Sequence, residues 1–528
     1  MKKMIVLLVV LVILLCACAK DNPARIRDEY RTYYEIFVHS FYDSDNDGIG
    51  DLKGVLNQFD YLNDGNANSK KSLNIGGLWL MPVMPSPTYH KYDVTDYYDI
   101  DPQYGSMNDF ESLITKCKDN DVALLIDLVL NHTSSAHEWF KSAAVSIGIP
   151  PCGQEICTHE NLCRDHNPYC KFYNFVQEPQ TGFAQVPLYS NWYYECRFWS
   201  GMPDLNLDEP LVRDEIVKIM TFWLNKGVSG FRLDAIMSFY TGNNEKNADF
   251  LKWLKTEAVK IDEKCYFVGE AWSTANIIKE LYESGIDSLF NFPFSQVEGL
   301  FIPAVRSENA SAVANRLETW QQEISQISPS SLDAVFLSNH DNGRSAGMLS
   351  RNAELVKMAA ALYILAPGNA FIYYGEEIGM VGSGKDENKR LPMLWSVEDK
   401  TGIPAPPPNA ELFEQPDKGA AEQLKDPNSV LNYYIRLIRL KNTYPAIAGG
   451  TLKAINTGND SAVFFSCTYG DETVYILHNI SSQLISIKLS EDMADFKKIE
   501  SSISVSGEKA KLKGDIIEMP ARSSAILK

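Results

Sequence analysis

The 528-residue sequence has no excess of basic residues and no long apolar run in its main body. Its 49 Lys and Arg are outnumbered by 68 Asp and Glu, a formal net charge of −19 that argues against nonspecific nucleic-acid binding. Hydrophobic residues make up 45% and charged residues 22%, which excludes a disordered, collagen-like or polytopic membrane protein. No internal repeat is evident. The length predicts about three or four globular domains.

The one long apolar run lies at the N-terminus. Two lysines precede twelve apolar residues, a length that is short for a bilayer span and typical of a signal peptide. The following Leu-Cys-Ala-Cys resembles a bacterial lipoprotein processing site, with Cys18 as the lipidated first residue rather than Cys16, which follows a bulky leucine. We expect a signal peptide over 1–18, a tether over 19–32, and an extracytoplasmic protein that is lipid-anchored to the bacterial cell envelope. A plain secretory signal and an uncleaved anchor are the alternatives.

Cysteine is sparse except in one stretch of 45 residues, which holds Cys152, Cys157, Cys163, Cys170 and Cys196. In an oxidising compartment such a cluster predicts disulfides that staple a small, loop-rich subdomain. The alternative is a zinc site, because His159 and His166 are interleaved, but the absence of a CxxC pair makes it the weaker interpretation. Five is odd, so at least one thiol is free or pairs elsewhere, and the connectivity stays open.

Eight short β-type runs alternate with helical patterns along the first four-fifths of the chain. The third, 122–130, is continuous in apolar residues as buried parallel strands are. This order predicts an α/β fold, a closed (β/α)₈ TIM barrel, with an open doubly wound sheet as the alternative. The predicted strands are 33–40, 75–81, 122–130, 228–233, 266–269, 288–292, 334–337 and 370–374.

Two further domains accompany the predicted barrel. The gap after the third strand is too long for a loop, so we expect an inserted Cys-rich subdomain over 133–203, between barrel segments 33–132 and 204–445. Short alternating runs over 446–528 predict a C-terminal antiparallel β-sandwich.

Polar residues gather where the predicted strands end. Asp127, Asn131 and His132 close the third strand, Arg232 and Asp234 close the fourth, Glu270 ends the fifth, and His340 and Asp341 follow the seventh. In a parallel barrel all strands end at one rim, so these groups are expected to converge on one site. Any single carboxylate among them is more simply a helix cap or a surface charge, but the whole set is poorly explained by coincidence.

Paired carboxylates in different environments suit glycoside cleavage with retention, in which one acts as nucleophile and the other as acid and base. Arg232 lies two residues before Asp234, on the same face of the strand, and would keep that carboxylate ionised. Glu270 is followed by Ala-Trp, and this apolar company would raise its pKa, as an acid/base requires.

Four ordered segments resemble the signature regions of the α-amylase family of glycoside hydrolases. They are DLVLNH at 127–132, GFRLD at 230–234, VGE at 268–270 and FLSNHD at 336–341. Supporting stretches are GLWLMP at 77–82, YDVTDY at 92–97, MPDLN at 202–206 and YGEEIG at 374–379. The MPDLN form resembles members intermediate between oligo-1,6-glucosidases and neopullulanases, a group that includes lipid-anchored α-amylases.

The resemblance implies a role for each matched residue. Asp234 would be the nucleophile, Glu270 the acid and base, and Asp341 a transition-state stabiliser. Four further residues would bind substrate or orient the nucleophile: Tyr92, His132, Arg232 and His340. Asp127 is expected to be structural. Many α-amylases carry Lys and His three and four residues after the nucleophile, whereas this chain has Met237 and Ser238, so its contacts beyond the scissile bond differ.

An acidic loop at 43–51, DSDNDGIGD, spaces oxygens at alternate positions around a glycine turn, as Ca²⁺ requires. It copies the first half of an EF-hand, but position twelve is Gly54 rather than Glu. A solvated acidic turn is the alternative; family members carry Ca²⁺ at a matching loop. The expected ligands are the side chains of Asp43, Asp45, Asp47 and Asp51 and the carbonyl of Ile49. Asn131 is a candidate ligand of a second calcium ion.

The sequence therefore predicts a monomeric retaining hydrolase of α-1,4-glucosidic bonds in starch or maltooligosaccharides. Transglycosylation or α-1,6 cleavage on the same site is the alternative. A non-catalytic glucan-binding lipoprotein is disfavoured, since all three carboxylates are present.

Overall fold

Eight parallel strands form a closed barrel at the centre of the computed structural model, which describes residues 30–159, 162–411, 413–489, 496 and 498–528. The strand order is β1-β11-β10-β9-β8-β7-β3-β2, and each strand is parallel to both neighbours. The strands are β1 (Thr32–Ile36), β2 (Gly77–Leu80), β3 (Ala123–Leu128), β7 (Gly230–Leu233), β8 (Tyr266–Gly269), β9 (Ser288–Phe290), β10 (Leu332–Val335) and β11 (Asn369–Tyr373). The predicted TIM barrel is confirmed.

Differences from the predicted strands are confined to their ends. β1 ends at Ile36, and Val38–Ser40 forms a 3₁₀ turn (η1) instead of continuing the strand. β10 begins two residues earlier than predicted. Gly230 opens β7 with φ +157°, and a Cβ there would lie 2.0 Å from the carbonyl oxygen of Tyr266 on β8, so only glycine allows this approach.

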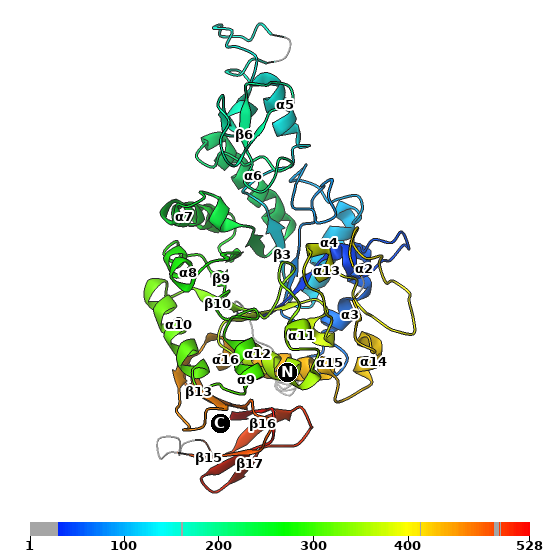
Figure 1. Cartoon of the computed structure of the whole chain (residues 1–528), viewed down its shortest axis with the longest axis vertical. Helices are drawn as coiled ribbons and strands as arrows, with labels where there is room; N and C mark the ends of the chain where they lie inside the picture. The colour runs from blue at the N-terminus through cyan, green and yellow to red at the C-terminus, as the bar shows by residue number, and fades with distance from the viewer. Residues whose placement is uncertain (1–29, 160–161, 412, 490–495, 497) are drawn as a thin grey trace, which may run out of the picture.

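Helices surround the barrel and bury their apolar faces against it (Figure 1). Within the described residues they are α2 (Leu52–Asn57), α3 (Phe59–Leu62), α4 (Met107–Asp119), α5 (Glu138–Ser146), α6 (Pro210–Lys226), α7 (Asn244–Ile261), α8 (Ala275–Tyr282), α9 (Phe301–Ser307), α10 (Val313–Ile327), α11 (Ser345–Met348), α12 (Ala353–Ile364), α13 (Asp386–Lys389), α14 (Ala420–Leu424), α15 (Val430–Thr443) and α16 (Pro445–Gly449). Among the longest are α6, α7 and α15, and each buries one apolar face and leaves polar side chains on the other.

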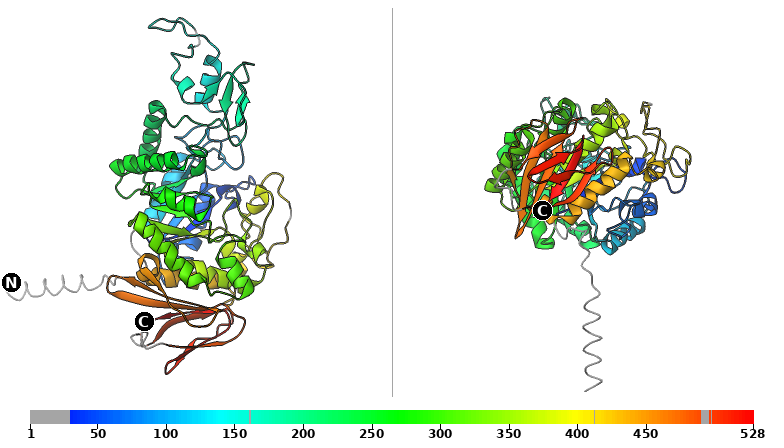
Figure 2. Two further views of the ribbon diagram at one scale, coloured as in Figure 1. Left: turned by 60° about the vertical axis from the view of Figure 1, so that its left-hand side comes forward. Right: turned by 90° about the horizontal axis from the view of Figure 1, so that it is seen from below.

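The segment between β3 and β7 extends from one end of the barrel, and the C-terminal domain covers the opposite end (Figures 1 and 2). The inserted segment holds α5, a 3₁₀ turn η2 (Pro168–Lys171) and a small sheet in the order β4-β6-β5. These strands are β4 (Phe175–Val176), β5 (Phe183–Gln185) and β6 (Tyr193–Glu195). All eight cysteines of the described residues are free thiols, so the predicted disulfides are not formed in the structure.

The C-terminal domain consists of two antiparallel sheets. Five strands pair in the order β12-β13-β14-β19-β16 and three in the order β15-β18-β17. Apolar side chains of both sheets, such as Phe464 and Ile517, share a second core. The strands are β12 (Thr451–Ala454), β13 (Ala462–Tyr469), β14 (Glu472–Asn479), β15 (Ile485–Lys488), β16 (Ile499–Ser504), β17 (Lys511–Lys513), β18 (Ile516–Met519) and β19 (Ser523–Leu527). The predicted β-sandwich is confirmed.

The predicted signal peptide, Cys16 and Cys18 lie outside the described residues. Among the residues described, none of the helices has both the length and the apolar character of a membrane span.

Candidate active site

Side chains from the carboxyl ends of four barrel strands meet in one cavity of about 570 Å³. Because all strands of a parallel barrel end at one rim, groups that follow β3, β7, β8 and β10 come together. The cavity is lined by three acidic residues that the sequence singles out, Asp234, Glu270 and Asp341, and by His90, Tyr92, His132, Phe198, Trp199, Met202, Ala235, Met237, Ser238, Trp272, Asp386 and Arg390.

Arg232 on β7 is fully buried and links the carboxylates of the site. Its Nη1 donates to Asp127 Oδ1 at 2.7 Å and to Asp234 Oδ1 at 2.8 Å. Its Nη2 lies 3.0 Å from Glu270 Oε2. The sequence predicts contact with Asp234 alone, so the structure adds two carboxylates to this guanidinium. One rigid fork thereby fixes the carboxylates of Asp234 and Glu270 beside each other.

Asp127, at the end of β3, is fully buried and forms an ion pair with Arg232. Its Oδ2 accepts hydrogen bonds from Tyr92 Oη at 3.1 Å and Trp79 Nε1 at 3.3 Å. With every oxygen paired inside the protein, Asp127 orients the site and has no free acceptor for a ligand.

Glu270 follows β8, and its Oε2 also accepts from the backbone N–H of Ala235 at 3.1 Å. Burial raises the pKa of Glu270; Arg232 opposes this rise, and the negative charges of Asp234 and Asp341 add to it. Ala235 has φ +44°, a left-handed conformation that is uncommon for a residue with a Cβ. This turn directly after Asp234 aims the Ala235 N–H at Glu270.

Asp341 and His340, after β10, form a charged chain. His340 Nδ1 lies 2.6 Å from Glu35 Oε1, and its Nε2 lies 3.0 Å from Asp341 Oδ2. Burial opposes protonation of His340, but Asp341 and Glu35 outweigh it and raise its pKa to about 10. Burial would also raise the pKa of Asp341, but His340 and Arg390, whose Nη2 lies 2.7 Å away, lower it well below its ordinary value. Asp341 is therefore held ionised at the cavity wall.

Two predicted binding residues face the same cavity. His132 is buried, burial lowers its pKa, and its Nε2 has no hydrogen-bond partner in the described part of the protein. A neutral imidazole with an unpaired nitrogen is a ready partner for a ligand hydroxyl. The ring of Tyr92 stacks on His340 with centroids 5.6 Å apart, and its hydroxyl lies 2.7 Å from His340 Nε2.

Several groups that complete the site are not among the residues predicted from the sequence. Arg390 and Glu35 hold Asp341 and His340 in place. Glu35 had a usable signal, because it is a charged residue inside an otherwise apolar strand, whereas Arg390 lies in no recognisable pattern. Three aromatic residues line the cavity while staying half-exposed: Phe198 (51%), Trp199 (52%) and Trp272 (53%). Exposed aromatic faces of this kind stack on flat apolar surfaces of ligands.

Met237 and Ser238, where the sequence departs from many α-amylases, also line the cavity. They belong to a 3₁₀ turn, η3 (Ile236–Ser238), directly after the left-handed Ala235. An uncharged thioether and a hydroxyl therefore occupy the wall beyond Asp234.

The acidic loop gathers Asp43, Asp45 and Asp51, each of which offers an oxygen within 4.8 Å of the others. Asp43 and Asp51 are buried, and Gly48 turns the chain with φ +94°. Three converging carboxylates fit the oxygen-rich coordination of Ca²⁺. Asp47 lies outside this group, and its Oδ1 accepts from the N–H of Ile49 at 2.7 Å. Asn131 Nδ2 lies 3.2 Å from Asp204 Oδ1, and its place in a second calcium site stays a prediction.

Residues 35–450 match the model of the protein family described as "Alpha amylase, catalytic domain". "Alpha-amylase 3" of Dictyoglomus thermophilum is 38% identical over 457 residues, which cover 85% of this chain and 84% of that protein. An oligo-1,6-glucosidase of Parageobacillus thermoglucosidasius is 28% identical, over 85% of this chain and 90% of its own. The solved structure of Eubacterium rectale Amy13B superimposes with a TM-score of 0.89 at 40% identity, covering 97% of both chains.

Proposed function

Because the chain belongs to the α-amylase family of glycoside hydrolases, we propose that it hydrolyses α-1,4-glucosidic bonds in starch or maltooligosaccharides with retention. The observation that carries this proposal is the shared Arg232 fork, which holds Asp234 and Glu270 at one cavity wall. Retaining hydrolysis requires two carboxyl groups about 5–5.5 Å apart around one anomeric carbon.

In the first step Asp234 attacks the anomeric carbon, and the bond to the leaving oxygen breaks as Glu270 gives that oxygen its proton. The raised pKa of Glu270 supplies the protonated form that this step needs. In the second step Glu270, now a carboxylate, removes a proton from water. The hydroxide oxygen displaces Asp234, so the product keeps the configuration of the substrate.

The other side chains hold the sugar in this mechanism. Asp341, ionised beside His340 and Arg390, accepts hydrogen bonds from sugar hydroxyls and stabilises the positive charge of the oxocarbenium-like transition state. His132 bonds a hydroxyl through its unpaired Nε2, and Tyr92 stacks on the ring. Phe198, Trp199 and Trp272 provide further stacking surfaces toward the cavity mouth.

The linkage is tested by incubating the purified protein separately with starch, pullulan, isomaltose and maltotriose and identifying the products. We expect shorter maltooligosaccharides from starch and no glucose from isomaltose. Cleavage of isomaltose in preference to maltotriose would favour α-1,6 activity, which Met237, Ser238 and the likeness to an oligo-1,6-glucosidase keep as the second candidate. In the incubation with maltotriose, products longer than the substrate would reveal transglycosylation. An Asp234→Asn variant serves as the inactive blank, and its activity at the wild-type rate would overturn the mechanism.

Calcium, location and assembly complete the proposal. Ca²⁺ bound by Asp43, Asp45 and Asp51 would fix the loop that precedes α2, where Asp51 also accepts from the N–H of Gly54. Lipidation at Cys18 would hold a monomeric enzyme on the outer side of a bacterial membrane, where extracellular glucan is accessible.

A further inference from the structure

The chain between α5 and η2 has few apolar side chains to hold its shape, and of these Ile147, at its start, is buried in the main core. Its described residues, 147–159 and 162–167, contain neither helix nor strand. Two of its larger apolar side chains point outward: Ile156 is 81% exposed and Leu162 44%. A loop of this length without a core is held in place in other small folds by a disulfide or a metal ion.

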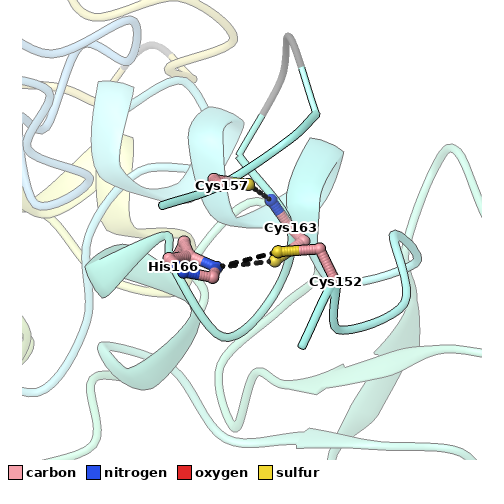
Figure 3. Close-up of side chains that lie close together, drawn as sticks. All are labelled: Cys152, Cys157, Cys163 and His166. Atoms are coloured by element: carbon pink, nitrogen blue, oxygen red, sulfur yellow. Dashed lines mark hydrogen bonds between the residues drawn. The ribbon is translucent and has the colours of Figure 1, made fainter. Parts of the chain in front are cut away.

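Within this loop four donor atoms converge on one point. The sulfurs of Cys152, Cys157 and Cys163 and a ring nitrogen of His166 all lie within 4.8 Å of one another. His166 Nδ1 lies 3.0 Å from Cys163 Sγ and 3.6 Å from Cys152 Sγ. Figure 3 shows both sulfurs directed at the imidazole, with Cys157 beside them. Cys163 and His166 lie in one turn at the end of the loop, where the N–H of His166 donates to the carbonyl of Cys163, whereas Cys152 and Cys157 come from its earlier part. The contact therefore joins the two parts of the loop.

We propose that Cys152, Cys157, Cys163 and His166 form a structural zinc site that fixes the inserted subdomain. Three thiolates and one imidazole are a closed tetrahedral donor set of the kind that structural zinc uses. Sulfurs about 2.3 Å from a common zinc lie about 3.8 Å apart at the tetrahedral angle, which agrees with the observed convergence.

The arrangement suits a metal better than a disulfide. A disulfide joins two sulfurs and has no need of a histidine, whereas here one imidazole faces two sulfurs and a third lies beside them. The N–H of Cys163 donates to Cys157 Sγ at 3.3 Å, an N–H···S contact that stabilises a thiolate. Cys163 and His166 have two residues between them, so they form a Cys-x₂-His pair with the short ligand spacing of zinc sites, although the sequence has no CxxC pair in this stretch.

The zinc content of the full-length, as-purified protein tests the proposal, measured by inductively coupled plasma mass spectrometry after growth with added zinc. We expect about one zinc per chain. His166→Ala and Cys163→Ser should each lose most of it. The matched controls His159→Ala and Cys170→Ser, whose side chains lie in the same segment but outside the donor group, should keep it. Each variant's circular dichroism and maltotriose hydrolysis report whether it has folded.

X-ray absorption at the zinc edge of the wild-type protein keeps the test independent of any variant. The expected spectrum has three sulfurs at about 2.3 Å and one nitrogen at about 2.0–2.1 Å. A metal-free wild-type protein whose mass and thiol count reveal a disulfide among the three cysteines would overturn the proposal. Zinc that persists at full stoichiometry in both His166→Ala and Cys163→Ser would also overturn it.

Discussion

Asp234 and Glu270 share one guanidinium, yet the proposed reaction needs them in opposite protonation states. Burial and the nearby carboxylates of Asp234 and Asp341 raise the pKa of Glu270, and Arg232 only partly opposes this. The cavity therefore favours the protonated form of Glu270. Asp341, in contrast, stays ionised, because the positive charges of His340 and Arg390 lower its pKa.

The pH dependence of kcat/KM follows from this difference. Since the proposed mechanism uses the protonated form of Glu270, kcat/KM should fall as pH rises through its pKa, which lies above the ordinary 4.5. Glu270→Gln should lower kcat on maltotriose by about 10²–10⁴-fold and remove this alkaline limb. The variant should lose much less activity on maltosyl fluoride, because a fluoride leaving group needs little proton donation. Glu263→Gln, at an exposed position, is the control; an unchanged alkaline limb in Glu270→Gln would contradict the assignment.

At the scale of elements, buried hydrogen bonds join the barrel to the turn after β11. Glu377 Oε1 accepts from Tyr34 Oη of β1 at 2.7 Å and from Tyr61 Oη of α3 at 2.6 Å. Its neighbour Glu376 accepts from Tyr363 of α12 and Tyr434 of α15. The YGEEIG segment thus connects β1 and α3 with α12 and α15 through buried hydrogen bonds.

Removing one of these donors should destabilise the fold and leave the chemistry intact. Tyr61→Phe deletes one hydroxyl beside the buried Glu377, so we expect a loss of about 1–3 kcal/mol in the free energy of unfolding. The matched control Tyr469→Phe, at a 43% exposed ring, should change stability little. Urea unfolding of both variants measures the difference. Equal stability of Tyr61→Phe and wild type would show that the bond contributes nothing.

Calcium is expected to stabilise the loop at 43–51. Removal with EDTA is expected to lower the midpoint of thermal unfolding, because Asp43, Asp45 and Asp51 then repel one another. Since EDTA also removes zinc, calcium and zinc are added back separately. Calcium is expected to restore the part of the lowered unfolding midpoint that zinc alone does not restore. In Asp45→Ala the effect of calcium should shrink. A midpoint that calcium leaves unchanged in the wild type would contradict the site.

The sequence predicts the barrel well because its strands are short apolar runs, and their order leaves few topologies. It predicts the convergence of Asp234, Glu270 and Asp341 because the first two directly follow β7 and β8 and the third lies in the loop after β10. It cannot predict Arg390 or Trp272, since loops position them and no periodic pattern marks their approach to the cavity. The clustered cysteines show the same limit: the sequence reveals the cluster, but only the folded loop shows that His166 faces two of the sulfurs.

At the scale of the whole molecule, the inserted subdomain and the C-terminal sandwich lie at opposite ends of the barrel (Figures 1 and 2). The first described residues lie near the C-terminal domain: the ring of Tyr30 contacts that of Tyr469 of β13, with centroids 5.6 Å apart. The described chain therefore begins beside the C-terminal domain, at the end of the barrel away from the insert.

The anchor is tested in cells. Cys18→Ala should move the enzyme from the membrane fraction to the soluble fraction and abolish incorporation of labelled palmitate, while Cys16→Ala should change neither. Immunoblots of the two fractions measure the shift. Membrane attachment that survives Cys18→Ala would favour an uncleaved anchor instead.

Covalent trapping tests the central claim most directly, namely that Asp234 attacks an anomeric carbon while Glu270 serves the leaving group. The enzyme is treated with 5-fluoro-α-D-glucosyl fluoride, digested with protease and analysed by mass spectrometry. The account predicts one glycosyl group per chain on the carboxylate of Asp234, accumulating in the wild type and absent from Asp234→Asn. A label on any other residue, or an enzyme that hydrolyses maltotriose but is never labelled, would contradict it.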